Sequence, residues 1–194
     1  KVIAAPIPSF YYMGFNMKKE PTSKLEVRKA ICQAINKQQI LEVALGNFGE
    51  VADTFYPKSI AWAADTSPDA APPTYDKAAA IKALDAVYPV KNGSRFKLTF
   101  PYFTASPEYA DIATVMKQNL KDVNIDVDLV ALEIGAWGTR MQSGDYDIGI
   151  LGGLWGPDPD NLKLRVGTGG GVNDWFYSSP DVDKLLAEGS ATVD

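Results

Sequence analysis

Apolar and polar positions follow two different periods along this chain, and segments of the two kinds alternate. In one group of segments apolar residues recur every three to four positions, which predicts amphipathic helices. These are residues 25–36, 37–45, 76–87, 106–120, 134–142 and 181–188. Between them lie short apolar or alternating runs, which predict strands. These are residues 96–100, 125–130 and 146–151. Alternating helices and strands predict an α/β fold.

Several predicted boundaries carry capping or turn residues. Thr22 or Ser23 is expected to cap the first helix, and Asp76 is expected to cap the helix at residues 76–87. A serine, a proline and an acid in succession open the helix at residue 106. Asn92-Gly93 predicts a turn before the first internal strand.

Two stretches show neither period. Residues 1–16 predict an extended segment, in which Pro6 and Pro8 are typical of an edge or crossing strand. Residues 47–74 form a connector rich in proline and alanine. A connector of this length within a compact domain is usually functional or partly disordered.

The run Gly-Gly-Leu-Trp-Gly-Pro-Asp-Pro-Asp-Asn at residues 152–161 concentrates recognition chemistry at the end of a predicted strand. Ligands of open α/β sheets bind at the carboxyl ends of strands, and glycines permit close backbone approach. We therefore expect Leu154 and Trp155 to contact a ligand, Trp155 by stacking, although a tryptophan here can also belong to the core. Asp158 either accepts hydrogen bonds from a ligand or, like Asp160, caps the next helix.

Five further residues are candidate ligand contacts. Tyr102 and Phe103 follow a predicted strand, and Asn173 follows the glycine-rich run. Trp137 and Arg140 are three residues apart and share one helix face. The alternative is that the aromatic side chains pack in the core and that Arg140 is solvated.

Composition excludes several classes of protein. The 194 residues suit one domain or one lobe of a larger protein, and the net charge of −5 argues against nucleic acid as a partner. The chain has no histidine, so the commonest general base and the commonest metal ligand are missing. Its single cysteine, Cys32, lies on an apolar helix face and is expected to fill the core. We predict no catalytic residue, no metal and no cofactor.

Blocks of sequence in a fixed order resemble family 5 of the bacterial extracellular solute-binding proteins. They begin with Phe15-Asn16 and the helical segment from Val27 to Ile40. The others are Tyr75-Asp76-Lys77-Ala78, Gly144-Asp145-Tyr146-Asp147, Pro157-Asp158-Pro159-Asp160-Asn161 and Ser179-Pro180-Asp181-Val182-Asp183.

The resemblance implies a periplasmic-binding-protein-like lobe of class II type, with a mixed sheet flanked by helices. Residues 1–194 would form the second, C-terminal lobe, cut at both ends, with residues 1–16 near the crossover between lobes. The resemblance also implies a monomeric protein, periplasmic or lipid-anchored outside the cell, that captures a small polar solute between two lobes. It would deliver that solute to the permease subunits of an ABC importer.

The chain departs from the family between Gly153 and Pro157. Peptide-binding members carry an acid there that pairs the peptide's amino group, and this sequence has only Leu154, Trp155 and Gly156. The departure weakens the case for a peptide with a free amino group, so an oligopeptide, an opine-like solute and a sugar-like solute all stay open. Two other functions stay open. One is a glycoside hydrolase using carboxylates such as Asp158 and Asp160, and the other is a non-catalytic interaction module docking through the connector.

Overall fold

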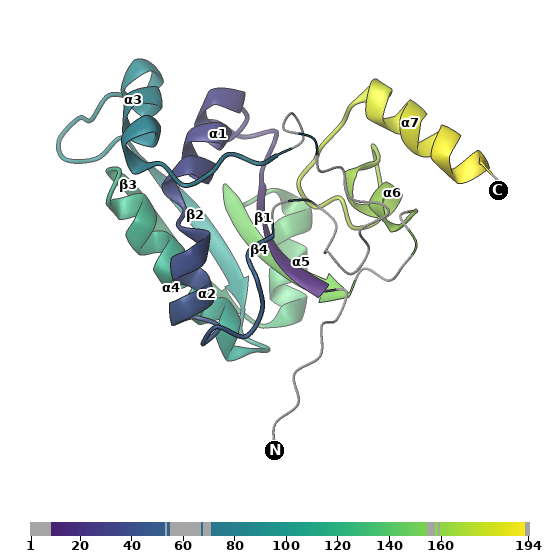
Figure 1. Cartoon of the computed structure of the whole chain (residues 1–194), viewed down its shortest axis with the longest axis horizontal. Helices are drawn as coiled ribbons and strands as arrows, with labels where there is room; N and C mark the ends of the chain where they lie inside the picture. Colours follow the sequence, from purple (N-terminus) through teal and green to yellow (C-terminus); the bar gives the residue numbers. More distant parts are fainter. Residues whose placement is uncertain are drawn as a thin grey trace.

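The computed structural model describes residues 9–52, 54, 67, 71–154, 158 and 160–192. Figure 1 shows its strands grouped at the centre, with α1 to α4 on one side of β2 and α5 on the other. The strands are β1 (Ser9–Phe15), β2 (Phe96–Phe103), β3 (Ile125–Leu132) and β4 (Ile148–Leu154). The helices are α1 (Leu25–Ala34), α2 (Lys37–Val43), α3 (Lys77–Val87), α4 (Pro107–Lys121), α5 (Ile134–Ser143), α6 (Asn161–Val166) and α7 (Pro180–Ala191).

The strands form two pairs of opposite kind. β2 and β3 are parallel, whereas β1 and β4 are antiparallel, with Ser9 opposite Leu154 and Phe15 opposite Ile148. The pairs meet where β4 begins, because the Asp147 amide donates to the carbonyl oxygen of Thr99 at 3.0 Å. The predicted α/β fold is confirmed, and its strands form one parallel and one antiparallel two-stranded sheet flanked by helices.

The helix patterns define the core as expected. On α4 the residues spaced at three and four positions are buried, and so is the corresponding stripe of α1. These residues are Tyr109, Ile112, Ala113, Met116 and Leu120 on α4, and Val27, Ala30, Ile31 and Ala34 on α1. They pack against strand residues such as Leu98 and Ile125, which have no exposed surface.

The predicted cap of α3 is confirmed and that of α1 is wrong, whereas Ser106 is the N-cap residue of α4 but forms no capping hydrogen bond with its side chain. The Asp76 carboxylate accepts the Ala79 amide at 2.9 Å, so it caps α3. Neither Thr22 nor Ser23 caps α1, whose N-cap residue is Lys24. The buried Thr22 hydroxyl donates instead to carbonyl oxygens of the preceding turn, at 2.9 Å each.

β4 is longer than the sequence predicts. Its apolar pattern ends at Leu151, yet pairing with β1 continues through Gly152 and Gly153 to Leu154. A partner strand holds these residues in the sheet although glycine has little preference for strands. Residues 1–8, most of the connector and Trp155 lie outside the described part of the chain. Among the described helices none has both the length and the apolar character needed to cross a bilayer.

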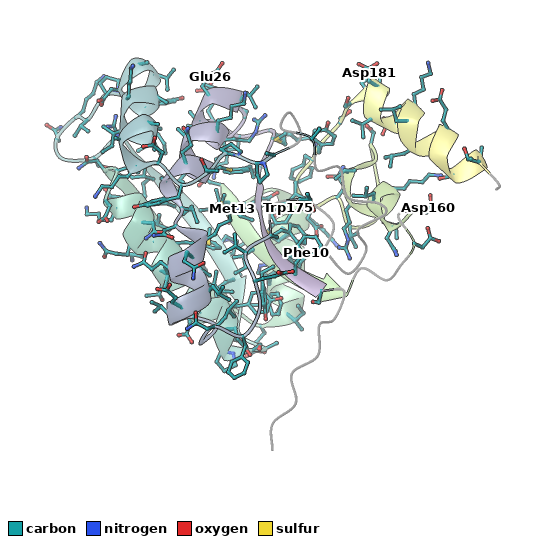
Figure 2. The ribbon with its side chains drawn as sticks, in the orientation of Figure 1. Phe10, Met13, Glu26, Asp160, Trp175 and Asp181 are labelled. Atoms are coloured by element: carbon teal, nitrogen blue, oxygen red, sulfur yellow. The ribbon has the colours of Figure 1, made fainter. Side chains whose placement is uncertain are left out.

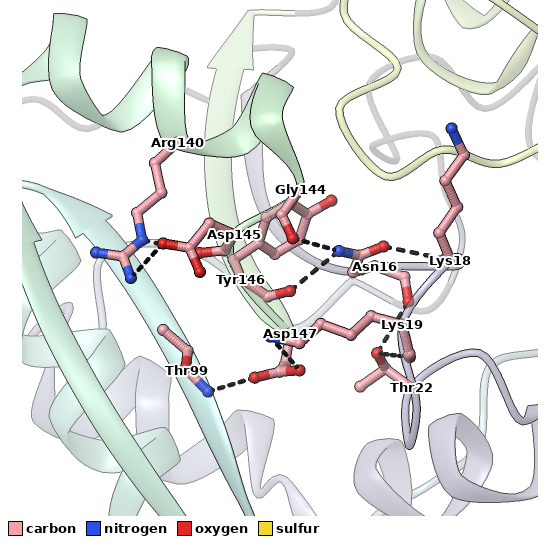
Figure 3. A network of polar contacts seen from close by, with 10 residues as sticks. All are labelled: Asn16, Lys18, Lys19, Thr22, Thr99, Arg140, Gly144, Asp145, Tyr146 and Asp147. Carbon is pink, nitrogen blue, oxygen red and sulfur yellow. Dashed lines mark hydrogen bonds and ion pairs between the residues drawn. The ribbon is translucent and has the colours of Figure 1, made fainter.

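A polar network fixes the end of β1 against the start of β4 (Figure 3). The buried Asn16 amide donates to the carbonyl oxygens of Gly144 and Tyr146 at 3.0 Å each. Its own carbonyl oxygen accepts the Lys18 amide at 3.0 Å. Asn16 therefore satisfies backbone groups that have left the regular ladder.

Asp147 is the second centre of this network. Its side chain is 5% exposed and accepts the Thr99 amide at 2.6 Å. The Lys19 ammonium lies 3.1 Å from its other carboxylate oxygen. Asp147 thus connects β2, β4 and the turn after β1, and thereby positions the strands that carry the candidate site.

Candidate functional site

Aromatic side chains gather where β2 ends. The Phe103 ring lies 4.0 Å from that of Tyr109 and 5.4 Å from that of Trp137, measured between centroids. The Trp137 indole donates to the carbonyl oxygen of Pro101 at 3.3 Å. Phe103, Tyr109 and Trp137 are buried, so they form the support of the site rather than its accessible surface.

Tyr11 extends this aromatic cluster to the molecular surface. Its ring meets that of Tyr109 edge-on at 5.4 Å, and its side chain is 41% exposed. The Tyr109 hydroxyl oxygen accepts the Gly152 amide at 3.0 Å. A Cβ atom at Gly152 would lie 2.7 Å from the Tyr11 ring, so only glycine permits this approach. Strand β4 therefore presents backbone directly beneath an exposed aromatic ring.

Two carboxylates accompany the aromatic cluster at the same edge. Glu108 accepts the Ser106 hydroxyl, and that bond lowers the pKa of the carboxyl group below its usual value. Burial, and secondarily the charge of Glu108, raises the pKa of Tyr11. Glu133 accepts the Thr104 hydroxyl at 3.4 Å. Among the described residues no lysine or arginine forms an ion pair with either glutamate, so the edge is acidic.

Four of the residues expected from the sequence lie toward the carboxyl ends of β2 and β4. Tyr102 and Phe103 end β2, and Leu154 ends β4, where its backbone lies opposite Ser9. Trp137 packs behind Phe103 and is 5% exposed. Trp155 lies outside the described residues.

Arg140 and Asn173 are placed elsewhere. The Arg140 guanidinium pairs with the Asp145 carboxylate at 2.8 Å, at the end of α5 that precedes β4. It therefore lies toward the amino end of that strand, away from the cluster. Asn173 donates to the carbonyl oxygens of Gly167 and Tyr177 at 2.9 and 2.7 Å, and accepts the Tyr177 amide at 3.1 Å. In this structure its side chain holds the loop between α6 and α7.

The two aspartates of the key loop make local contacts. The Asp158 carboxylate accepts the Asp160 amide at 2.9 Å, just before α6. Asp160 accepts the Ser190 hydroxyl of α7. Both aspartates are exposed. Asp160 is the N-cap residue of α6, but its side chain forms no capping hydrogen bond, so the cap expected from it is not formed.

Sequence reasoning missed Tyr11, Tyr109 and Glu108 as site residues. Tyr109 lies on the buried apolar face of α4, as the helical period predicts, but its hydroxyl also accepts a hydrogen bond from β4. The available signal was an aromatic run on β1 together with the glycines of β4, which become informative only once the two strands are paired. Within the described residues no group of three or more histidine, cysteine, aspartate or glutamate side chains is placed to hold a metal. The arrangement offers stacking, hydrogen bonding and negative charge.

Replacing Tyr109 with phenylalanine removes the acceptor of the Gly152 amide and keeps the ring. We expect the free energy of unfolding to fall by about 1 kcal/mol, the usual contribution of one such bond. Urea denaturation of the variant measures this. The matched control is Tyr88→Phe. The Tyr88 hydroxyl donates to Glu20 and accepts from Lys24, both at least partly exposed, so its loss should change stability by less than about 0.5 kcal/mol. Equal effects of the two variants would contradict the role assigned to Tyr109.

The family model for the middle region of bacterial extracellular solute-binding proteins, family 5, matches residues 1–174. A curated relative, the probable D,D-dipeptide-binding periplasmic protein DdpA of Escherichia coli, is 29% identical over 205 residues. That match covers all of this chain and 38% of the relative. Across the first curated relatives the chain spans 34% to 38% of their length.

Solved structures agree with this match. The oligopeptide-binding protein AppA of Bacillus subtilis, in complex with a nonapeptide, superimposes with a TM-score of 0.87 at 24% identity, and the match covers all of this chain and 41% of that one. A dipeptide-binding protein of Pseudoalteromonas sp. SM9913, in complex with Met-Leu, gives a TM-score of 0.85 at 26% identity. It covers 97% of this chain and 38% of that one.

Proposed function

The chain belongs to family 5 of the bacterial extracellular solute-binding proteins, and from this premise we propose that it forms the second lobe of a two-lobe protein that captures a peptide for an ABC importer. One observation carries the proposal for the site. The half-exposed Tyr11 ring lies over the backbone of Gly152 at the carboxyl edge of the sheet. An edge of this kind offers a ligand both a flat apolar surface and hydrogen-bonding backbone.

The charge at this edge supports a peptide as the solute. The sequence lacks the acid expected between Gly153 and Pro157, which leaves opine-like and sugar-like solutes open beside a peptide. The structure holds another acid, Glu108, beside Tyr11, and its carboxyl group is ionised at neutral pH because the Ser106 hydrogen bond lowers a pKa that is already acidic. A carboxylate beside an exposed aromatic ring suits the ammonium group of a peptide. The relatives named above are also described as peptide-binding proteins.

The rest of the proposal follows from the family. The family is described as extracellular. We propose more narrowly that this protein is periplasmic or lipid-anchored, that it is a monomer, and that it docks on the permease subunits of an ABC importer. Since the chain spans little more than a third of its curated relatives, the remaining contacts to the solute would come from a first lobe.

The alternative functions gain no support. The carboxylates of Asp158 and Asp160 are engaged in contacts around α6, not turned toward a shared substrate position. The relatives are binding proteins, so we propose that this protein does not change its solute. The interaction-module hypothesis depends on the connector, most of which lies outside the described residues.

Alanine at Tyr11 or at Trp155 should weaken solute binding by the two-lobe protein. Each loss of stacking area is expected to cost about 1–3 kcal/mol, which is a decrease of roughly fivefold to 150-fold in affinity. Isothermal titration calorimetry with trialanine, maltose and octopine measures this, and trialanine should bind in the micromolar range or tighter. The control is Tyr88→Ala, because Tyr88 packs on Phe96 at the amino end of β2.

The same titrations decide the solute class. Binding of maltose or octopine with no binding of trialanine would contradict the peptide assignment. Unchanged affinity in Tyr11→Ala would remove Tyr11 from the site.

A further inference from the structure

Strand β4 contains three glycines, at positions 149, 152 and 153. Glycine in the interior of a strand weakens it, since it loses more backbone freedom on folding and offers no side chain to pack. Such a glycine therefore often marks a place where another group comes close to the backbone. The three glycines of β4 differ in the group that comes close to them.

Two of the glycines are explained by packing within the chain. A Cβ atom at Gly149 would lie 3.1 Å from the Met141 methyl carbon and 3.2 Å from the Trp175 ring. A Cβ atom at Gly152 would lie 2.7 Å from the Tyr11 ring and 3.0 Å from the Tyr109 hydroxyl. Side chains of this protein already occupy both spaces.

The third glycine is not explained in this way. Among the described residues no heavy atom lies within 4 Å of the place where a Cβ atom of Gly153 would stand. Side chains alternate along a strand, so this space lies on the same face as Gly149 and on the opposite face from Gly152. Gly153 is at the carboxyl end of β4, one residue beyond the backbone that Tyr11 covers.

An aromatic row borders this open space. Phe10 is the direct partner of Gly153 across the antiparallel ladder, so its side chain belongs to the same face. The Phe10 ring is 5.7 Å from Tyr12, whose ring is 6.0 Å from Trp175. Figure 2 shows Phe10 and Trp175 near β1. Trp175 covers Gly149, and at the other end of the row Phe10 lies beside the position that the described residues leave open.

We propose that Gly153 is a specificity-determining position, and that the space above it, bordered by Phe10, receives an apolar side chain of the bound peptide. The inference rests on the proposed function and adds the size and polarity of one accepted group. A phenyl or branched aliphatic group suits the space, because one wall is an aromatic ring and the floor is bare backbone. A side chain at position 153 would compete with the ligand for this space.

The test uses the two-lobe protein with Gly153→Ala and Gly153→Leu, and Gly152→Ala as the matched control. The first measurement is the thermal unfolding midpoint. Gly153→Ala should leave the midpoint unchanged or raise it, because the methyl group meets open space and alanine restricts the unfolded chain. Gly152→Ala should lower it, because the methyl group collides with Tyr11.

The second measurement is peptide affinity by calorimetry. The probes are trialanine and the three tripeptides in which one alanine is replaced by phenylalanine. The phenylalanine peptide that the wild type binds best should lose affinity by at least about tenfold in Gly153→Leu, the usual discrimination of a filled apolar pocket. Trialanine affinity should change by less than about threefold, since a methyl group does not need the space. Gly153→Ala should fall between the wild type and Gly153→Leu.

Three results would overturn the inference. Equal affinity changes for trialanine and for the phenylalanine peptide would show that position 153 does not read side-chain size. A loss of stability in Gly153→Ala as large as in Gly152→Ala would show that the chain itself fills the space. Absence of peptide binding by the wild type would overturn the proposed function as well, which separates the two failures.

Discussion

Alanine in place of Asp147 is expected to lower the free energy of unfolding by about 2–3 kcal/mol, because a buried hydrogen-bonded carboxylate is lost. The Thr99 amide loses its 2.6 Å acceptor, and the Lys19 ammonium loses its partner at 3.1 Å. The Lys19 side chain is 41% exposed and regains water, which keeps the loss below that of a fully buried ion pair. Urea denaturation followed by circular dichroism measures the change.

Asp145 provides a matched control two residues away. It also forms an ion pair, with Arg140 at 2.8 Å, but its side chain is 67% exposed. Exposed pairs contribute little, so Asp145→Ala should cost less than about 1 kcal/mol. Asp147→Asn should fall between the two, because an amide oxygen still accepts the Thr99 amide. If Asp145→Ala and Asp147→Ala were equally destabilising, the network around Asp147 would not hold the strands together.

The position of this network explains why it matters for the site. Asp147 directly precedes β4, and the same strand carries Gly152 and Gly153 at its far end. The antiparallel register with β1 then brings Tyr11 to Gly152 and Phe10 to Gly153. Polar contacts at one end of the strand pair thus fix aromatic contacts at the other.

Features determined by neighbouring residues were predictable from the sequence. The α/β class follows from two alternating periods, and Asp76 caps α3 because its carboxylate reaches an amide three residues on. Asn92-Gly93 forms the predicted turn, with φ values of 53° and 86° that asparagine and glycine tolerate best. Each of these depends only on chemistry within a few residues.

Features determined by distant residues were not predictable. β4 continues past Leu151 because β1, about 140 residues earlier, pairs with it. Thr22 fails to cap α1 because its hydroxyl serves the turn that follows β1. Arg140 shares a helix face with Trp137, yet α5 ends away from the aromatic cluster and Asp145 pairs with the arginine there. Spacing along the sequence determines which residues share a helix face, whereas tertiary packing determines which part of the protein that face contacts.

Gly14→Ala is the other substitution expected to be strongly destabilising. A Cβ atom at Gly14 would lie 2.0 Å from the Trp175 indole, which is buried between Tyr12 and Tyr146. The methyl group can be accommodated only if the indole moves, and overpacking of this kind costs about 3 kcal/mol. Urea denaturation gives the change in stability, and the Trp175 fluorescence maximum should shift to longer wavelength as the ring becomes more exposed.

Gly138→Ala is the control for this last prediction. Gly138 lies inside α5, and among the described residues no atom lies within 4 Å of a Cβ atom added there. Alanine is the better helix former, so this variant should gain up to about 1 kcal/mol. The two glycine-to-alanine changes should therefore have opposite signs. A neutral Gly14→Ala would mean that Trp175 does not pack on the β1–β4 pair, and the aromatic row that ends at Phe10 would lose its anchored end.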